Sequence, residues 1–328
     1  MAVERKLLGV NPSGGGVSLD VDDVFSIDVY TGTSVAKTIT NGIDLAGEGG
    51  MVWIKRSDGT PDHNLYDTNR GVGKYLRTGI AATEATEATY LNAFNADGFG
   101  LGADIGGYAN YNTFDYASWT FRKAPTFFDV VSYTGNGVAG RTVAHSLGAV
   151  PEMMWVKCTD FAYDWTVYHK SLGNTKYLRL NEDQSELTTD GVWDNTTPDD
   201  SEFTLGDGSV VSANTNLFIA YLFTSLAGVS KVGSYTGNGT NQTIACGFSA
   251  GARFILIKRT DALGDWYVWD SSRGIIAGND PHLSVNTTAG EVTSDDSVDP
   301  ANSGFIVNQV SATNINVSSG TYIFYAIA

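Results

Sequence analysis

The chain has 328 residues with 36 acidic and 20 basic side chains, giving a formal net charge of −16. This excess of negative charge argues against nucleic-acid binding, which requires clustered lysine and arginine. The sequence contains no run of about 20 apolar residues and begins without the apolar stretch of a secretory signal peptide. We therefore expect no transmembrane helix, and a protein that is made in a cytoplasm and not exported by its own sequence.

In chain order, the sequence repeats one series of landmarks three times. Each copy opens with Tyr-Thr-Gly, at residues 30–32, 133–135 and 235–237. An apolar segment then ends in a lysine, and an aromatic segment, a Phe-led segment and a closing aromatic segment follow. The lysines are Lys55, Lys157 and Lys258. The period is about 100 residues, which is long enough for each copy to bury its own core as a small domain.

These landmarks divide the chain into four parts. We predict an N-terminal docking arm at residues 1–24 and three modules at residues 25–125, 126–227 and 228–328. The junctions between modules are only a few residues long. Short linkers favour modules that pack against one another, as a stiff rod or as a compact block with pseudo-threefold character.

Within each module the composition is typical of short strands joined by tight turns. Glycine is abundant at 38 residues and proline scarce at 7. In the second module a strand is expected to end at Asn136-Gly137, a favoured tight-turn pair, with Arg141 to His145 returning antiparallel. Residues 80–93 are compatible with a short helix or a loop. Seven or eight strands per module predict an all-β fold of three tandem β-sandwiches of the jelly-roll or lectin-like kind.

Aromatic residues fall into a repeated and an unrepeated set. Trp53 and Trp155 occupy repeated positions, as do Trp119 and Tyr221, and we predict that these residues fill cores. The unrepeated aromatics lie in polar, loop-like segments, which suits surface recognition of a glycan or a protein partner. These candidate contact residues are Tyr108, Tyr111, Phe114, Phe161 and Tyr163.

The N-terminal arm carries a short charged and apolar tip before a flexible, glycine-rich joint at residues 11–16. We predict that this tip docks the chain onto a partner, with a frayed terminus as the alternative. Its residues are Arg5, Lys6, Leu7 and Leu8.

Motifs for catalysis or metal binding are not recognisable. The four histidines have no metal-ligand spacing, and nucleophile elbows, phosphate loops and dinucleotide fingerprints are absent. The acidic pairs at residues 199–200 and 295–296 are interpreted as solvated loops, with weak calcium sites as the alternative. We therefore expect no catalytic residue, metal or cofactor, and no enzyme activity.

Two further expectations concern single residues. Cys158 and Cys246 occupy non-equivalent positions in different modules, so we predict two free structural thiols rather than a disulfide. Asp67 and Asp270 end equivalent segments. We predict that they are structural and pair with Arg70 and Arg273.

The order of these landmarks resembles that of tail-fibre-like virion proteins of bacteriophages, including those of marine and cyanobacterial phages. The resemblance covers essentially the whole chain. The segments that carry it are residues 5–8, 22–26, 30–32, 53–55, 66–71, 94–102 and 117–125. The resemblance implies lectin-like sandwich modules in a tail appendage, located in the virion after assembly in the host cytoplasm.

The leading hypothesis is therefore a structural protein of a tail fibre or tail appendage. It would dock to other virion proteins through its N-terminal region, form a homotrimer, and contact host surface glycans with many weak sites. No nucleic acid or membrane insertion is expected. Two alternatives stay open: a capsid decoration or head fibre protein, and a tail enzyme that degrades a surface polysaccharide with a carboxylate pair.

Overall fold

The computed structural model describes residues 19–328 of the chain. This part contains 25 strands and two helices of four residues each, α1 (Val21–Val24) and α2 (Ser209–Ser212). Every strand pairing is antiparallel, and the predicted all-β sandwich class is confirmed. In the described residues no helix has the length and apolar character needed to cross a membrane.

The first module consists of a six-stranded main sheet and a three-stranded small sheet. The main sheet has the order β1 (Phe25–Thr31), β9 (Asp115–Arg122), β3 (Gly50–Arg56), β4 (Asn64–Asp67), β5 (Lys74–Arg77), β6 (Ala85–Thr86). The small sheet has the order β2 (Lys37–Thr40), β8 (Gly98–Leu101), β7 (Leu91–Asn95). The segment at residues 80–93 contributes strands and loops but no helix.

The other two modules repeat this order of strands. In the second module the main sheet is β10 (Phe128–Thr134), β17 (Leu217–Phe223), β12 (Met153–Cys158), β13 (Thr166–His169), β14 (Lys176–Arg179), β15 (Leu187–Thr188), and the small sheet is β11 (Arg141–Ala144), β16 (Glu202–Leu205). In the third module the main sheet is β18 (Ser230–Thr236), β25 (Thr321–Ile327), β20 (Phe254–Arg259), β21 (Trp266–Asp270), β22 (His282–Ser284), and the small sheet is β19 (Gln242–Ala245), β24 (Gly304–Val307), β23 (Val298–Ala301).

The expected hairpin after Asn136-Gly137 does not form. Gly137 does adopt a left-handed φ of 67°, but β10 pairs with β17, whereas β11 pairs with β16 in the small sheet. The reason is that the backbone N–H groups of Gly135 and Gly137 donate to the loop before β17. These hydrogen bonds direct the chain into the small sheet, where β11 pairs with β16, instead of back onto β10.

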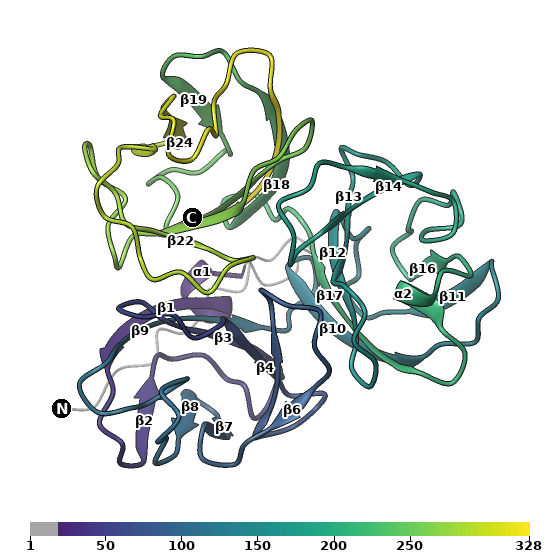
Figure 1. Ribbon diagram of the computed structural model, residues 1–328, viewed down its shortest axis with the longest axis horizontal. Helices are drawn as coiled ribbons and strands as arrows, with labels where there is room; N and C mark the ends of the chain where they lie inside the picture. Colours follow the sequence, from purple (N-terminus) through teal and green to yellow (C-terminus); the bar gives the residue numbers. More distant parts are fainter. Residues whose placement is uncertain (1–18) are drawn as a thin grey trace, which may run out of the picture.

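The central strands of each main sheet are buried on both faces. One face packs on the small sheet of its own module, as two sheets do in a β-sandwich. The opposite faces of the three main sheets meet in one central core, around which Figure 1 shows the three modules arranged as a closed ring. Trp53, Trp155 and Phe254 from the three modules belong to this core, and the indole centroids of Trp53 and Trp155 lie 5.9 Å apart.

The central core confirms that the repeated aromatics fill cores and changes the expected domain picture. Trp119 and Tyr221 are fully buried in it, together with Trp53 and Trp155. Burial of each such side chain contributes about 1.5–3 kcal/mol or more, so the three modules depend on a shared core for much of their stability. They form the compact block rather than the rod, and they are not independent packing units.

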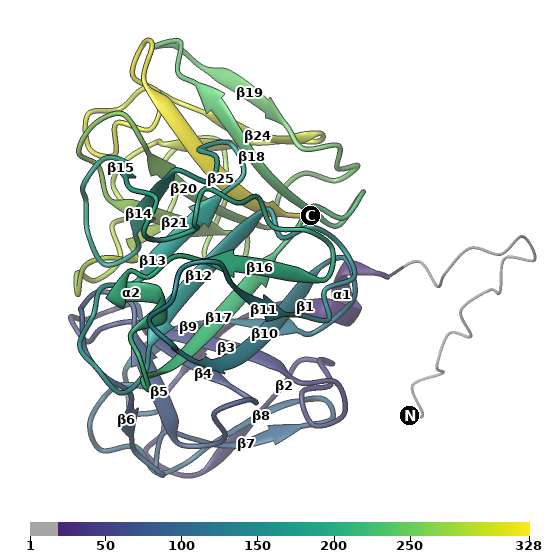
Figure 2. The same cartoon turned by 90° about the vertical axis from the view of Figure 1, so that its right-hand side faces the viewer.

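The block has two different ends (Figure 2). At one end lie α1, the first residues of the strands that open each module, and the last residue, Ala328. Arg253 ties this end together, because it donates to the Ala328 carbonyl at 2.6 Å and pairs with Asp22 at 2.8 Å. Val24 of the expected arm is fully buried in the central core. A seven-residue strand spans roughly 20 Å, so the Tyr-Thr-Gly segments that end β1, β10 and β18 lie at the opposite end of the block.

Candidate binding sites at the seams between modules

The three modules meet along three equivalent contacts, which we call the 1–2, 2–3 and 3–1 seams after the modules that they join. In each seam a glutamate that follows the β5-type strand of one module donates its backbone N–H to a carbonyl in the next module. The donor and acceptor pairs are Glu84 to Thr159 at 2.7 Å, Glu186 to Thr260 at 2.9 Å, and Glu291 to Ser57 at 2.8 Å. Because the third pair returns to the first module, the ring is closed.

A ring N–H makes a second equivalent contact in each seam. The indole Nε1 of Trp165 donates to the Arg77 carbonyl at 2.8 Å, and that of Trp266 donates to the Arg179 carbonyl at 2.9 Å. In the 3–1 seam His63 replaces the tryptophan, and its Nε2 lies 3.1 Å from the Ser284 carbonyl.

The tautomer of His63 follows from its neighbours. Trp53 Nε1 can only donate, and it lies 2.9 Å from His63 Nδ1, so Nδ1 accepts and Nε2 carries the proton. Burial holds the pKa of His63 well below its ordinary value, which keeps the ring neutral.

The repeated lysines shape the loops that receive the neighbouring module. Lys55, Lys157 and Lys258 are fully buried, and each ammonium group donates to backbone carbonyls of the loop that follows its strand. Lys55 and Lys258 also reach a carbonyl of the preceding module in the ring. Burial lowers the pKa of each lysine to about 8. These residues are structural parts of the seams.

The Tyr-Thr-Gly segment has a geometric explanation. Tyr30, Tyr133 and Tyr235 each stack on an aromatic ring of the closing strand, with centroids 5.3, 5.2 and 4.8 Å apart. Their hydroxyl groups donate to backbone carbonyls of the segment that precedes the closing strand, at 2.6–2.8 Å. The glycine is required because the same segment approaches closely: a Cβ on Gly135 would lie 2.1 Å from the Ala213 carbonyl oxygen.

Each seam holds a pocket between the Tyr-Thr-Gly strand of one module and the loop before the β5-type strand of another. The cavity volumes are about 280 Å³ in the 1–2 seam, 440 Å³ in the 2–3 seam and 420 Å³ in the 3–1 seam. All three are lined by the tyrosine and threonine of the motif and by the seam glutamate: Tyr133, Thr134 and Glu84; Tyr235, Thr236 and Glu186; Tyr30, Thr31 and Glu291. The repeat thus builds the same cavity three times.

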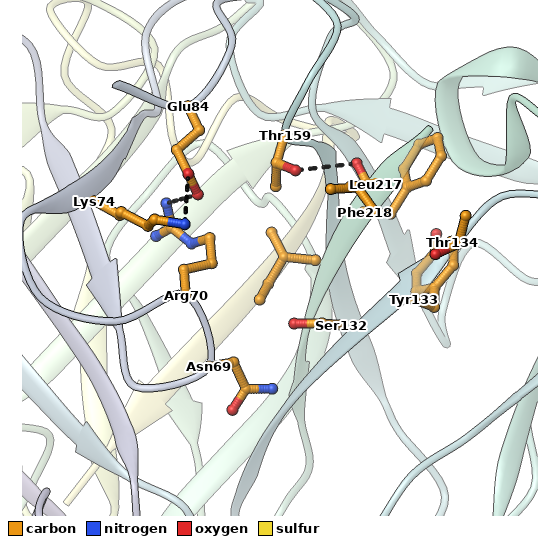
Figure 3. Close-up of a pocket in the computed structure, with 11 residues that line it drawn as sticks. Asn69, Arg70, Lys74, Glu84, Ser132, Tyr133, Thr134, Thr159, Leu217 and Phe218 are labelled. Atoms are coloured by element: carbon orange, nitrogen blue, oxygen red, sulfur yellow. Dashed lines mark hydrogen bonds and ion pairs between the residues drawn. The ribbon is translucent and has the colours of Figure 1, made fainter. Parts of the chain in front are cut away.

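The 1–2 seam pocket carries the most charged groups on one wall. Figure 3 shows Arg70, Lys74 and Glu84 of the first module on one side and Ser132 of the second module on the other. Glu84 lies 3.5 Å from Arg70 Nη1 and 3.4 Å from Lys74 Nζ. The wall therefore offers both donors and acceptors to the cavity.

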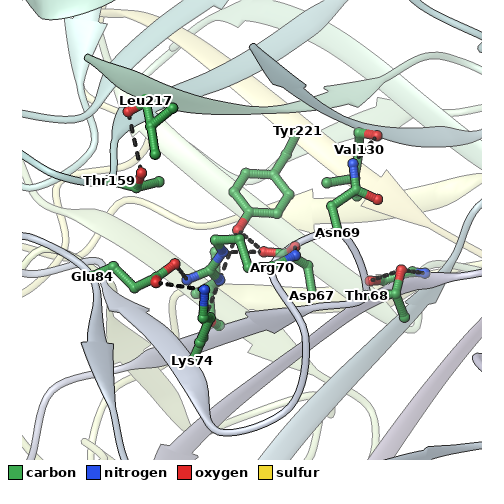
Figure 4. A network of polar contacts seen from close by, with 12 residues as sticks. Asp67, Thr68, Asn69, Arg70, Lys74, Glu84, Val130, Thr159, Leu217 and Tyr221 are labelled. Atoms are coloured by element: carbon green, nitrogen blue, oxygen red, sulfur yellow. Dashed lines mark hydrogen bonds and ion pairs between the residues drawn. The ribbon is translucent and has the colours of Figure 1, made fainter. Parts of the chain in front are cut away.

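A buried polar network supports this wall from behind (Figure 4). Asp67 is fully buried and accepts from Arg70 Nε at 2.5 Å and from the Tyr221 hydroxyl of the second module at 2.7 Å. The carboxylates of Asp67 and Glu84 and the Tyr221 hydroxyl raise the pKa of Arg70 despite its burial. The predicted Asp67–Arg70 pair is confirmed.

The 3–1 seam has the corresponding network. Asp270 accepts from Arg273 Nε at 2.6 Å, which confirms the second predicted pair, and from Trp119 Nε1 of the first module at 3.1 Å. Arg273 Nη1 donates to Glu291 at 2.9 Å. Asp115 also lines this pocket, so two carboxylates face it.

The 2–3 seam departs from this pattern. His169 and Leu172 stand where the other seams have aspartate and arginine, and Tyr325 stands in the place of Tyr221. His169 Nε2 and the Tyr325 hydroxyl are buried without a hydrogen-bond partner. Burial lowers the pKa of His169 to about 3 and raises that of Tyr325 far above its ordinary value.

The predicted contact aromatics lie elsewhere, and none of them lines a seam pocket. Tyr111 and Phe114 stack at 4.7 Å on an exposed loop of the first module, and the Arg56 guanidinium lies 3.2 Å from the Phe114 ring centroid. Tyr108 is half-buried and packs on the core of the first module.

In the second module Phe161 is half exposed and lies 4.5 Å from Tyr163. Tyr163 packs on the core of that module, and its carbonyl accepts from Lys157. The two groups of aromatics therefore form separate surface features.

Other predicted features are placed as follows. The docking residues Arg5, Lys6, Leu7 and Leu8 lie outside the described residues. Cys158 and Cys246 are buried and free, as predicted. Within residues 19–328 no group of three or more His, Cys, Asp or Glu side chains has the geometry to hold a metal ion.

Sequence reasoning misses the pocket residues, because repetition within a module is usually a sign of packing. The signal was present in the sequence: Tyr-Thr-Gly and the later Arg-Gly of residues 70–71 and 273–274 both repeat, and both are polar. Their juxtaposition depends on the ring, in which one motif meets the other only across a seam.

Comparison with known proteins gives a single positive finding. No curated protein matches the chain, and no solved structure matches it. The match is to a domain of unknown function, DUF7483, over residues 20–328. This match spans all three modules, and the chain therefore belongs to the DUF7483 family.

Proposed function

We propose that the chain is a structural component of a bacteriophage tail appendage that binds host surface glycans. The main support for this proposal is that the two ends of the block differ. The described N-terminal segment, α1, enters at one end, and the three seam pockets open near the other. A chain attached to a tail through its N-terminal region would thus direct its pockets away from the particle. The assignment to a phage rests on the resemblance of the landmark series.

The pockets suit a binding protein that relies on several weak sites. Each one combines hydroxyl, carboxylate and aromatic groups in a cavity of a few hundred cubic ångströms. Polar groups of this kind recognise hydroxyl-rich ligands through directed hydrogen bonds. Three such sites on one rigid block would gain avidity on a surface that presents repeated sugars.

Cryo-electron microscopy of the parent particle tests the appendage. We expect density for this chain on the tail, with residues 1–24 contacting another virion protein and the three seam pockets facing outward. A position on the capsid surface would overturn the proposal in favour of a decoration or head fibre protein. Absence from the particle would favour a free enzyme.

The alternative of a polysaccharide-degrading enzyme is favoured by one observation. Asp115 and Glu291 both line the 3–1 seam pocket, and glycoside hydrolysis needs two carboxylates in one groove. Incubation with host polysaccharide tests it. Release of oligosaccharide by the wild-type chain, lost in Asp115→Asn, would establish the enzyme; an unchanged polysaccharide supports the binding protein.

We also propose that the chain forms a homotrimer in the appendage. One copy already places three modules around an axis, so the trimer would present nine seam pockets. Native mass spectrometry of the purified chain gives the number of copies directly, and a monomer at micromolar concentration would contradict the proposal.

A further inference from the structure

Arg70 carries an unused hydrogen-bond donor at the wall of the 1–2 seam pocket. Its Nε donates to Asp67, and its Nη2 donates to the Leu65 carbonyl at 2.8 Å and to the Tyr221 hydroxyl at 3.2 Å. Its Nη1 is buried and makes no hydrogen bond. The side chain is only 6% exposed and lines the 1–2 seam pocket. A buried N–H group without a partner is costly, and a ligand atom in the pocket would remove that cost.

The acceptor beside this donor, the Glu84 carboxylate, makes only long contacts with its basic neighbours. Glu84 is 20% exposed and approaches Arg70 Nη1 and Lys74 Nζ at 3.5 and 3.4 Å, which are distances of loose ion pairs rather than of hydrogen bonds. The Ser132 hydroxyl lines the opposite wall, on β10 of the second module (Figure 3). Donors and acceptors therefore face the same cavity from two modules.

This mixture selects a class of ligand. A hydroxyl group both donates and accepts, so two adjacent hydroxyls can accept from Arg70 and Lys74 and donate to Glu84. A carboxylate, sulfate or phosphate would accept from the same cations but would meet the negative charge of Glu84. The cavity of about 280 Å³ lies just below the range of roughly 300–1,000 Å³ typical of drug-sized ligands, which suits one sugar ring.

We propose that the 1–2 seam pocket binds one neutral monosaccharide unit, with adjacent hydroxyls held between Arg70 Nη1 and the Glu84 carboxylate. This deepens the proposed glycan-binding function and rests on it. The other seams lack this arrangement, because Arg273 Nη1 is already bonded to Glu291 at 2.9 Å and Leu172 offers no donor. The three seams thus share a frame, and the 1–2 seam is the selective one.

The test uses the full chain and five defined probes: the methyl glycosides of glucose, galactose, mannose and rhamnose, and methyl glucuronide. Saturation-transfer NMR detects binding, and titration gives Kd. We expect at least one neutral glycoside to bind, and Glu84→Gln to weaken it by about tenfold or more, because a charged hydrogen bond is lost. Ser132→Ala, on the other wall, should weaken the same probe by a smaller factor.

The matched control is Glu48→Gln, which makes the same change at an exposed position of the first module that lines no seam pocket, and it should leave Kd within about twofold of wild type. Thermal unfolding of each variant verifies the fold. Tighter binding of the glucuronide than of every neutral glycoside, an unchanged Kd in Glu84→Gln, or no binding of any neutral probe would each overturn the proposal.

Failure of the pocket is distinguishable from failure of the proposed function. Binding of the fluorescently labelled chain to host cells measures the function as a whole. Cell binding that survives unchanged in Glu84→Gln would place glycan contact at another surface, such as the exposed Tyr111 ring that stacks on Phe114. Loss of cell binding in Glu84→Gln, with Glu48→Gln unaffected, is the result expected from the proposed site.

Discussion

The 1–2 and 2–3 seams share the same hydrogen bonds to backbone carbonyls, but the first contains a buried ion pair and the second has neutral residues in its place. In the 1–2 seam the fully buried Asp67 is satisfied by Arg70 and by the Tyr221 hydroxyl. In the 2–3 seam the equivalent residues are the neutral His169 and Tyr325, and the His169 Nε2 atom and the Tyr325 hydroxyl are buried without a hydrogen-bond partner. The frame therefore does not depend on the ion pair. A buried pair is often no more stabilising than neutral groups of similar size, whereas removing one of its members is costly.

The largest expected effect comes from breaking the charged seam. Asp67→Ala leaves the Arg70 charge buried without its main partner, and we expect a loss of about 3–5 kcal/mol in the free energy of unfolding. His169→Ala, at the equivalent position of the neutral seam, should cost only about 1–2 kcal/mol, since it removes packing without stranding a charge. Urea denaturation of both variants measures the difference. Equal losses would show that the buried charge is not what distinguishes the seams.

Acid should weaken the neutral seam next. The pKa of His169 is about 3 in the folded chain and about 6.5 in an unfolded one. Between these pH values the unfolded chain binds more protons than the folded chain. The contribution of neutral His169 to the free energy of unfolding is therefore fully present above pH 6.5 and is lost as the pH falls. At pH 5 the expected loss from His169 is about 2 kcal/mol.

His169→Asn isolates this contribution in denaturation curves recorded at pH 8 and pH 5. The pKa of Asp280, raised by burial to about 7, works in the opposite direction, since it favours the folded chain in acid. Asp280 is the same in both proteins, so its contribution cancels in the comparison. An equal loss between pH 8 and pH 5 in wild type and variant would contradict the assignment to His169.

The smallest net effect is expected from converting one seam into the other. His169→Asp with Leu172→Arg installs the carboxylate and guanidinium of the 1–2 seam beside the Tyr325 hydroxyl. We expect the double variant to lie within about 1 kcal/mol of wild type, while each single variant is clearly less stable. A double-mutant cycle gives the coupling energy, expected at about 1–3 kcal/mol. A coupling near zero would mean that the two seams differ in geometry as well as in residues.

Much of the fold was predictable because it depends on contacts within a module. Repetition of Trp53 as Trp155 indicated burial, and the equivalent positions of Asp67 and Asp270 indicated structural carboxylates that pair with nearby arginines. The direction of β11 was not predictable from its turn. Asn136-Gly137 has the chemistry of a hairpin, but the loop before β17 binds the turn and redirects the chain.

The seam pockets were beyond prediction for a different reason. Tyr133 and Glu84 are far apart in the chain and belong to different modules, and their meeting depends on the central core. The hydrophobic effect that forms this core is non-directional, so composition does not determine which modules become neighbours. Unrepeated aromatics such as Tyr111 were the more conspicuous sequence signal, yet they stack on nearby rings of their own loop.

The closed ring also sets a limit on how such a chain can change over generations. The contact of Glu291 with Ser57 joins the last module to the first, so a duplicated fourth copy would find no free seam, and the loss of one copy would leave two seams open. The closed ring therefore fixes the number of modules in the chain, whereas the residues of each seam can change independently. Each copy contributes its Tyr-Thr-Gly strand to one cavity and its glutamate to another, so a single inherited substitution in a cavity wall alters one cavity and leaves the two ancestral ones in place.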